Sequence, residues 1–257
     1  MTEPSLSVVT IVRNEAHNIE DFFRCIEGIA DELIIVDTGS TDTTVERIHE
    51  MTQQASFPVH FLEKRFEPFH FGKAKNFAIN RARGSYVFFL DADERIDQTF
   101  RVALKALLQK QHIHVLQTNR VDELVPHFID PQFRIFENDP AIRYGEDAAA
   151  CVDEILQFNG DAFIFDHPLL HFQGKNHLLR RPQRNLFQLE LDVDRTPRTR
   201  GWLREILRGV VAFYYIFKKI YFTREARKDG RIGLKYALLR AWYKFLVHFF
   251  VACKPRQ

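Results

Sequence analysis

The sequence lacks the features that mark several large classes of protein. Its three cysteines, Cys25, Cys151 and Cys253, lie far apart and form no Cys-x-x-Cys pair, which argues against a disulfide framework or a zinc site and favours a reducing compartment. The phosphate-binding patterns Gly-x-Gly-x-x-Gly and Gly-x-x-x-x-Gly-Lys-Ser/Thr are missing, so the usual phosphate cradle of a dinucleotide site or a P-loop is not expected. The sequence has no run of about 18 uncharged apolar residues, so a membrane-spanning helix is not expected.

The first residues do not resemble a secretion signal. A signal peptide needs a basic start and a long apolar segment, whereas this chain has Glu3 and then a short apolar run that ends at Arg13. We therefore expect a first buried strand and a cytoplasmic protein. Hydrophobic residues make up 46% of the 257 residues and charged residues 27%, values of an ordinary globular chain that exclude disorder and collagen.

Charge is distributed unevenly along the chain. The formal net charge is only +2, but residues 198–257 hold 15 Lys and Arg against three acids, a net charge of +12. The rest of the chain therefore carries a net charge of −10. An acidic body with a basic tail suggests a polyanionic partner, either nucleic acid or an anionic membrane. We expect a body over residues 1–197 and a tail over residues 198–257, with the boundary at Pro197.

Short apolar runs alternate with helical periodicity in the first half, which is the pattern of an α/β sheet. The expected strands are Leu6–Val12, Leu33–Val36, Val59–Leu62 and Tyr86–Leu90. A helix over Lys73–Arg83 is expected to stop at Gly84. The middle is less regular, and the expected tail helices are about Trp202–Phe222 and Ile232–Cys253. Helical periodicity also recurs over Asn176–Leu191.

Three polar clusters follow three of the predicted strands. They are Arg13–Glu15, Asp37–Asp42 and Asp91–Glu94. Ligands of open α/β sheets bind at the carboxyl ends of the strands, so these clusters are expected at one functional edge.

Two of the polar features predict particular ligands. Asp91 and Asp93 place two carboxylates at a strand end, where they can hold Mg²⁺ or Mn²⁺ together with substrate phosphates. Lys73, Lys75 and Asn76 open a helix, and a helix N-terminus with added cations favours an anion. The alternatives are a solvated loop or helix cap for the two aspartates, and two solvated surface lysines.

Four segments carry a family resemblance. They are Val9–Glu15 (VTIVRNE), Glu32–Thr44 (ELIIVDTGSTDTT), Phe71–Asn76 (FGKAKN) and Gly84–Glu94 (GSYVFFLDADE). Together they resemble family 2 glycosyltransferases of the GT-A fold, and most of all the bacterial lipopolysaccharide core glucosyltransferases that act on inner-core heptose. The resemblance implies an α/β mixed sheet flanked by helices, C-terminal amphipathic helices, a UDP-sugar donor, with glucose the expected sugar, and a lipid-anchored saccharide acceptor.

The resemblance also implies roles for single residues on the donor side. Asp37 would contact the uridine, with Arg13 and Glu15 lining the nucleotide pocket. The residues expected near the nucleotide sugar are Lys73, Lys75 and Asn76.

On the metal side, Asp91 would bind near the ribose or the metal, and Asp93 would hold Mg²⁺ or Mn²⁺ on the diphosphate. Arg134, in a segment similar to the Arg-Leu-Phe motif of the family, and His171, in one similar to its Pro-Leu-His motif, would lie on the acceptor or diphosphate side.

The expected general base is Glu154. The family places a His-Glu pair at this point, and the matching residues here are Asp153 and Glu154, so the glutamate is kept and the histidine is replaced. Glu146 and Asp147 are alternative bases, and any of these acids could instead be a salt-bridge partner. The alternatives for the whole chain are a transferase for another sugar or acceptor, such as a capsule, a lipid-linked glycan or a protein, or a non-catalytic sugar-nucleotide or membrane-binding module.

The basic tail is expected to lie on a membrane. Arg240, Lys244 and His248 recur every four residues and form a basic stripe among leucine, phenylalanine and tryptophan, which is typical of an interfacial helix on anionic lipid. One alternative is packing on the body, with the cations as a solvated rim. Nucleic acid is the other, but no recognised binding motif occurs. We expect a peripheral protein on the inner face of the bacterial inner membrane.

Overall fold

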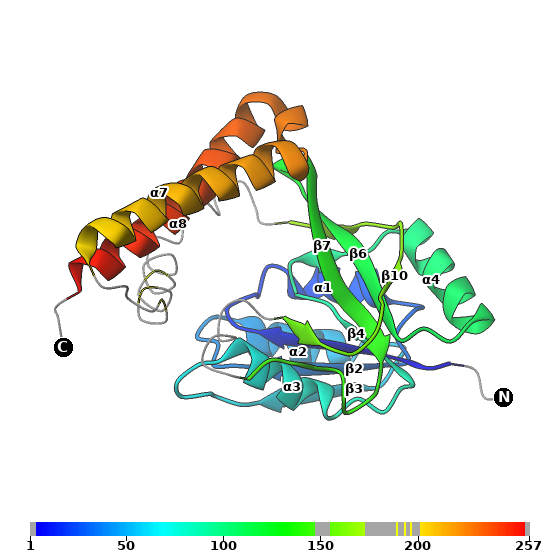
Figure 1. Ribbon diagram of the computed structural model, residues 1–257. Helices are drawn as coiled ribbons and strands as arrows, with labels where there is room; N and C mark the ends of the chain where they lie inside the picture. Colours follow the sequence, from blue (N-terminus) through cyan, green and yellow to red (C-terminus); the bar gives the residue numbers. More distant parts are fainter. Residues whose placement is uncertain are drawn as a thin grey trace. The chain divides into compact units, whose positions relative to one another are not determined.

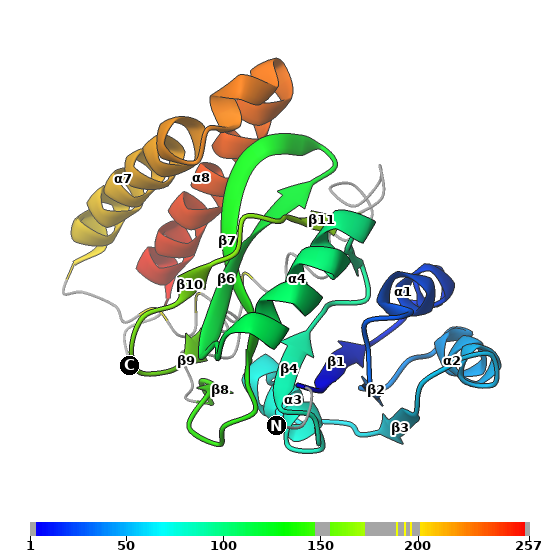
Figure 2. The same ribbon diagram turned by 90° about the vertical axis from the view of Figure 1, so that its right-hand side faces the viewer.

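The computed structural model describes residues 4–146, 155–172, 189, 193, 196 and 201–254 of the chain. Figure 1 and Figure 2 show the chain from two directions. Its residues fall into two compact units, one of residues 1–120 with 131–172 and the other of residues 121–130 with 173–257. The helix predicted for residues 176–191 lies outside the described residues, apart from Leu189.

A mixed sheet forms the centre of the first unit. Its parallel part has the order β3 (Val59–Glu63), β2 (Glu32–Asp37), β1 (Leu6–Val12) and β4 (Tyr86–Phe89). Next to β4, and antiparallel to it, comes β7 (Val125–Glu137), followed by β6 (Val115–Asp122), β11 (Leu169–His171) and β5 (Glu94–Arg95). β10 (Phe163–Ile164) pairs with β6, and β8 (Arg143–Tyr144) with β9 (Leu156–Gln157) makes a separate ribbon. The predicted mixed α/β sheet is confirmed.

Helices cover both faces of the parallel strands. The helices of the first unit are α1 (Ile19–Ile26), α2 (Thr44–Thr52), α3 (Phe71–Ile79) and α4 (Gln98–Lys110). Val8 and Phe88 pack with residues of α1, α2 and α4, whereas their neighbours Val9 and Phe89 pack with residues of α3 on the other face. Successive side chains of a strand point to opposite faces, so a strand covered on both faces has to be apolar throughout. This explains the continuous apolar runs of the sequence.

The connection from α3 to β4 differs from the prediction. The helix ends at Ile79, with Asn80 as its C-cap, and Gly84 lies beyond it, two residues before β4. A Cβ on Gly84 would lie 2.8 Å from the backbone nitrogen of Ser7 and 2.9 Å from the backbone oxygen of Ser5. Gly84 is therefore needed for the close approach of the chain to β1, where its N–H donates to Oγ of Ser7 at 2.8 Å.

Two long antiparallel helices, α7 (Trp202–Lys218) and α8 (Gly230–Cys253), hold most of the described residues of the second unit (Figures 1 and 2). Both were predicted at nearly these bounds. The predicted charged connection contains a π-helical turn, η2 (Lys219–Thr223), and a 3₁₀ turn, η3 (Ala226–Asp229). The two long helices approach closely at Gly209, where a Cβ would lie 3.1 Å from side-chain atoms of both Phe245 and His248.

The ends of β6 and β7 nearest their connection belong to the second unit. Val125 and Phe128 share a small buried cluster with Ile220, Ala226 and Ala237. Polar contacts fix the same segment, because Arg224 pairs with Asp130 at 3.1 Å and His127 lies 2.6 Å from Asp229. The helical pair thus has its own core around the tip of this hairpin.

Candidate active site

The carboxyl ends of β1, β2 and β4 meet at one edge of the sheet, because the three strands are parallel neighbours. Arg13–Glu15 follows β1, Asp37–Asp42 begins at the last residue of β2, and Asp91–Glu94 follows β4. The structure therefore places the three predicted polar clusters at the same edge. It is the edge at which open α/β sheets bind their ligands.

Hydrogen bonds join the polar cluster that follows β1 to the one that follows β2. The carboxylate of Asp37, 2% exposed, accepts from the backbone N–H of Gly39 and of Ser40, both at 2.9 Å, and from the Ser40 hydroxyl. Asn14, with a φ of 57°, donates its N–H to the Ser40 hydroxyl at 2.9 Å and accepts from the N–H of Thr41 at 2.8 Å. These bonds hold the two loops in one defined arrangement.

The other predicted residues of these loops differ in exposure. Arg13 is exposed, and Glu15 is half-buried. The backbone N–H of Glu15 donates to the Thr44 hydroxyl at 2.8 Å, and its carboxylate accepts from Asn18 at 2.7 Å. Glu15 therefore links the first loop to the start of α2, and Arg13 projects from the edge.

Arg134, on β7, joins two carboxylates that follow β4. Its Nη2 lies 2.5 Å from Oδ2 of Asp91 and 2.8 Å from Oε1 of Glu94. The backbone N–H of Asp91 donates to the second oxygen of Glu94 at 3.1 Å, and Arg120 lies 3.6 Å from Glu94. The side chain of Glu94 is 0% exposed and that of Arg134 is 4% exposed. Such a buried ion pair is favourable only when further bonds offset the loss of hydration.

These contacts shift the pKa values of the carboxyls in opposite directions. Burial raises the pKa of Asp91, but the positive charges of Arg134, Lys75 and Arg120 outweigh burial and hold that pKa well below its usual range. Burial has the largest influence on Glu94 and raises its pKa; Arg134 opposes it, the charge of Asp91 reinforces it, and the pKa stays raised. Asp91 is thus the ionised member that faces the edge, since its side chain is 30% exposed.

Asp93 has a different partner, His171. Strand β11 pairs with β5 so that His171 stands opposite Glu94, and its Nε2 lies 3.3 Å from Oδ2 of Asp93. Burial raises the pKa of Asp93, but the hydrogen bond and the charge of His171 outweigh burial and lower it. The structure therefore brings together four residues predicted for the metal and diphosphate side, which are Asp91, Asp93, Arg134 and His171.

Lys75 lies between two aromatic rings. It is only 4% exposed, and its Nζ is 4.4 Å from the ring centre of Phe89 and 4.6 Å from that of Tyr144. A cation over an aromatic face is attracted by the ring quadrupole, more strongly when it is desolvated. Its charge also acts on Asp91. Lys73, by contrast, is exposed on α3.

Asn76 is a buried residue that holds the segment following β8. Its amide donates to the backbone oxygen of Tyr144 at 2.8 Å and accepts from the N–H of Tyr144 at 2.9 Å. The same amide donates to Oε1 of Glu146 at 2.8 Å. Asn76 thus positions Glu146, one of the alternative bases, at the end of the described segment. The other candidates, Asp147, Asp153 and Glu154, lie outside the described residues.

The donor set at Asp91 and Asp93 fits a hard divalent cation. Both are carboxylates with a lowered pKa, and Oδ2 contacts Arg134 in Asp91 and His171 in Asp93. Among the described residues, no group of three or more His, Cys, Asp or Glu could hold a metal by itself. Two carboxylates suit Mg²⁺ or Mn²⁺, which keep several ligands from water and substrate phosphates.

Sequence reasoning missed the buried partners of the site. Glu94 was part of the Asp91–Glu94 cluster but received no role, and Arg120 and Tyr144 received none either. Their contacts join β5 to β6 and β7, and α3 to β8, and no local spacing in the sequence indicates such pairings.

A comparison with known protein families decides the family. The profile of glycosyl transferase family 2 matches residues 7–182, more than half of the chain. The chain belongs to glycosyl transferase family 2.

Individual relatives share shorter or more distant likenesses. A lipopolysaccharide core biosynthesis glycosyltransferase, LpsC of Rhizobium meliloti, is 35% identical over 88 residues, which are 33% of this chain and 31% of the relative. An uncharacterized glycosyltransferase of Rickettsia bellii is 25% identical over 63% of this chain and 53% of its own length. The matches thus span about a third to a half of these relatives.

Among solved structures, the mannosyltransferase PcManGT from Pyrobaculum calidifontis, in complex with GDP-Man and Mn²⁺, is similar with a TM-score of 0.53. The match covers 98% of this chain and 87% of that one, at 14% sequence identity. This likeness agrees with the predicted GT-A fold.

Replacing Arg134 tests the buried network. We expect Arg134→Met to lower the free energy of unfolding by about 3–5 kcal/mol, because Glu94 would remain buried without its nearer cationic partner and would keep only Arg120, at 3.6 Å. Adding Glu94→Gln to Arg134→Met should recover part of that loss. As a control, Arg24→Met breaks the ion pair of Arg24 with Glu20, whose side chains are 68% and 50% exposed, and should cost only about 0–1 kcal/mol. Urea unfolding followed by circular dichroism measures both, and equal losses for Arg134→Met and Arg24→Met would contradict the network.

Proposed function

We propose that this family 2 glycosyltransferase transfers glucose from UDP-glucose to an inner-core saccharide of lipopolysaccharide. The observation that carries the proposal is the pair Asp91 and Asp93, two carboxylates with lowered pKa values at the carboxyl edge of the sheet. The similarity to a lipopolysaccharide core biosynthesis glycosyltransferase over 88 residues supports the acceptor. A capsule, a lipid-linked glycan or a protein as acceptor, and a non-catalytic module, are the alternatives that the experiments below separate.

The nucleotide would bind at the bonded loops after β1 and β2. Asp37 would contact the uridine from the turn that its own carboxylate stabilises, and Arg13 and Glu15 would line the pocket. Lys73 would meet the donor from the exposed start of α3. Lys75 and Asn76 are buried and would act indirectly. Lys75 would act through its charge on Asp91, and Asn76 by holding Glu146.

Asp91 and Asp93 would hold Mg²⁺ or Mn²⁺, which when bound neutralises charge on the diphosphate. A structural neighbour that holds GDP-Man and Mn²⁺ supports this role. Arg134 would keep Asp91 in place and add positive charge behind the diphosphate, and His171 would do the same for Asp93.

The reaction would be a single inverting displacement. An acceptor hydroxyl attacks the anomeric carbon of the donor sugar, forming a new C–O bond. The bond from that carbon to the diphosphate oxygen breaks, and UDP leaves with the electron pair. Glu154, with Asp153 beside it, would take the proton of the hydroxyl as general base.

Replacing Asp93 tests the metal and diphosphate side. We expect Asp93→Ala to lower UDP release from UDP-glucose by about 100-fold or more in Mn²⁺ or Mg²⁺, because charge on the leaving diphosphate would lose its stabilisation. The control Asp161→Ala changes an exposed aspartate and should keep wild-type release. Circular dichroism would verify that both variants are folded. Near-normal release by Asp93→Ala would contradict the role of Asp93, and no release by the wild type from any UDP-sugar of a panel would favour a non-catalytic module.

The base is tested by a matched pair of substitutions. We expect Glu154→Gln to bind UDP with unchanged affinity in calorimetry and to lose transfer to truncated lipopolysaccharide that ends in inner-core heptose, because an amide cannot accept the proton. Glu146→Gln is the control and should retain transfer. The opposite result would move the base to Glu146, and an inactive wild type on this acceptor that still releases UDP would point to another acceptor.

We also propose that the basic tail binds an anionic membrane surface. On α7, apolar side chains that are more than half exposed are Trp202, Leu203, Leu207, Val210, Val211, Tyr214 and Tyr215. They accompany the net charge of +12 of residues 198–257. Within the described residues, no helix is long and apolar enough to cross a membrane. An apolar helix surface among cations fits an element that lies in the lipid interface.

The membrane proposal predicts a loss of vesicle binding on changing exposed apolar residues of α7. Leu203→Ser with Val210→Ser should weaken partition onto vesicles of phosphatidylcholine and phosphatidylglycerol by roughly tenfold or more, since each side chain contributes about 1.5 kcal/mol when buried in lipid. Leu203 and Val210 are 58% and 53% exposed. The control, Val102→Ser with Ile164→Ser, changes residues of the other unit that are 58% and 69% exposed. Equal partition of the two double variants in a flotation assay would contradict the proposal.

A further inference from the structure

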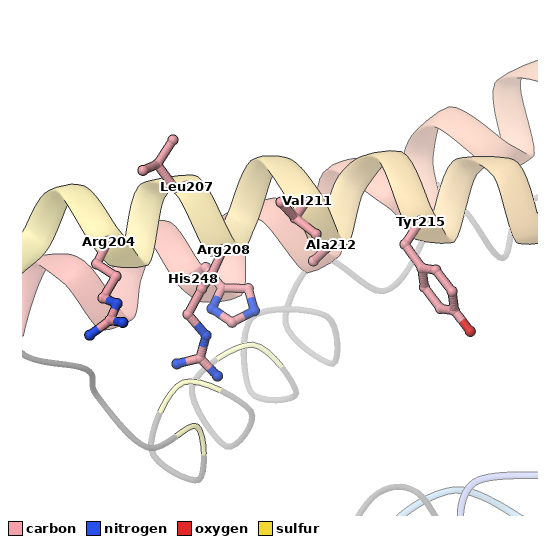
Figure 3. Close-up of a pocket in the computed structure, with 7 residues that line it drawn as sticks. All are labelled: Arg204, Leu207, Arg208, Val211, Ala212, Tyr215 and His248. Atoms are coloured by element: carbon pink, nitrogen blue, oxygen red, sulfur yellow. The ribbon is translucent and has the colours of Figure 1, made fainter.

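The helical pair contains a pocket that none of the proposed catalytic residues lines. It has a volume of about 420 Å³. The residues that line it come from α7 and, in one case, from α8, and they are Arg204, Leu207, Arg208, Val211, Ala212, Tyr215 and His248. In Figure 3, Arg204, Arg208 and His248 gather toward one end of the pocket, and Tyr215 lies further along α7.

The polar end of the pocket combines two guanidinium groups with an imidazole. Arg204 and Arg208 lie four residues apart and therefore on the same side of α7. Arg204 is exposed, and no carboxylate in the described part of the chain forms an ion pair with it. His248 reaches the same end from α8. Guanidinium groups bind phosphate oxygens through charge-assisted hydrogen bonds.

A buried carboxylate orients two of these groups. The side chain of Glu205 is 0% exposed and accepts from Nη1 of Arg208 at 3.1 Å, and Nδ1 of His248 lies 3.3 Å from its other oxygen. A guanidinium carries five N–H donors and can serve more than one acceptor at a time. Glu205 therefore fixes Arg208 and His248 in place, as a preorganised anion site requires.

The rest of the pocket lining is mainly apolar. The pocket as a whole is much larger than a phosphate group. Val211, Ala212 and Tyr215 continue the lining along α7, and the side chains of Val211 and Tyr215 are 68% and 61% exposed. A volume of about 420 Å³ falls within the range of pockets that hold small organic ligands, about 300–1,000 Å³. A cationic end joined to an apolar groove matches a ligand with an anionic head and a hydrocarbon chain.

We infer that this pocket binds the phosphate headgroup of a membrane lipid, with the phosphate at Arg204, Arg208 and His248 and the start of the acyl chain along Val211 and Tyr215. The inference rests on the proposed membrane association and deepens it, because it adds a defined headgroup site to a diffuse attraction between a basic surface and an anionic bilayer.

Calorimetry on the full chain with dihexanoyl phosphatidic acid, below its micelle concentration, tests the inference. We expect saturable binding that Arg204→Gln weakens by about tenfold, the effect of losing one charge-assisted contact. Arg204 is exposed, so this variant should remain folded. The control Arg231→Gln removes the same charge from an exposed position of α8 outside the pocket and should bind like the wild type. An equal loss in both variants would overturn the inference in favour of diffuse charge.

The apolar part of the pocket is tested with a second matched pair. Val211→Ser should weaken binding of the lipid, whereas Val102→Ser, which changes an exposed valine outside the pocket, should not. Inorganic phosphate distinguishes a lipid from a free anion: we expect it to bind at least about tenfold more weakly than the lipid, since it leaves the apolar lining exposed. Equal affinities would overturn the lipid assignment.

The experiment also separates the inference from the membrane proposal. If the wild type binds anionic vesicles but not the short-chain lipid, the headgroup site is wrong and the membrane proposal stands. If the wild type binds neither, both are wrong.

Discussion

The candidate active site depends on the contact of Arg134 with Asp91 and Glu94. Three carboxylates follow β4 within four residues, and they would repel one another if no cation were held among them. Arg134 comes from β7, which pairs with β4 in antiparallel register, so the cation is placed by the sheet itself. The buried carboxylate of Glu94 holds the guanidinium of Arg134 in place. The charge of Arg134 in turn keeps Asp91 ionised at the edge of the sheet.

Much of the fold could be predicted because the buried faces of strands and helices require apolar residues at regular positions in the sequence. Val8 and Val9 pack on opposite faces of the sheet, and this two-sided burial produces the continuous apolar runs from which the strands were predicted. The ends of elements were less predictable. Gly84 suggested the end of a helix, whereas its physical role is a close approach to β1, and that contact depends on residues 77 positions apart.

The candidate site was predictable to the extent that its residues follow strands in the sequence. Parallel pairing brings the ends of β1, β2 and β4 together, so that Asp37 and Asp91 could be assigned to one edge without knowledge of side-chain contacts. The division of roles on α3 could not be predicted in this way. Lys73 and Lys75 are two positions apart and so point in different directions, one exposed and the other enclosed by Phe89 and Tyr144. Tyr144 lies far along the chain, and its contact with Lys75 has no local signal.

The net charge of the basic tail understates how much positive charge its surface carries. The three acids of residues 198–257 all have partners within the second unit: Glu205 pairs with Arg208 and His248, Glu225 with Lys228, and Asp229 with His127. His248 therefore belongs to an internal contact and not to the outward basic stripe that its spacing with Arg240 and Lys244 suggested. Because the acids are used internally, the cations of the tail outnumber the carboxylates that could neutralise them. A partner with its own negative charge is then the simplest way to offset that excess next to the exposed apolar side chains of α7.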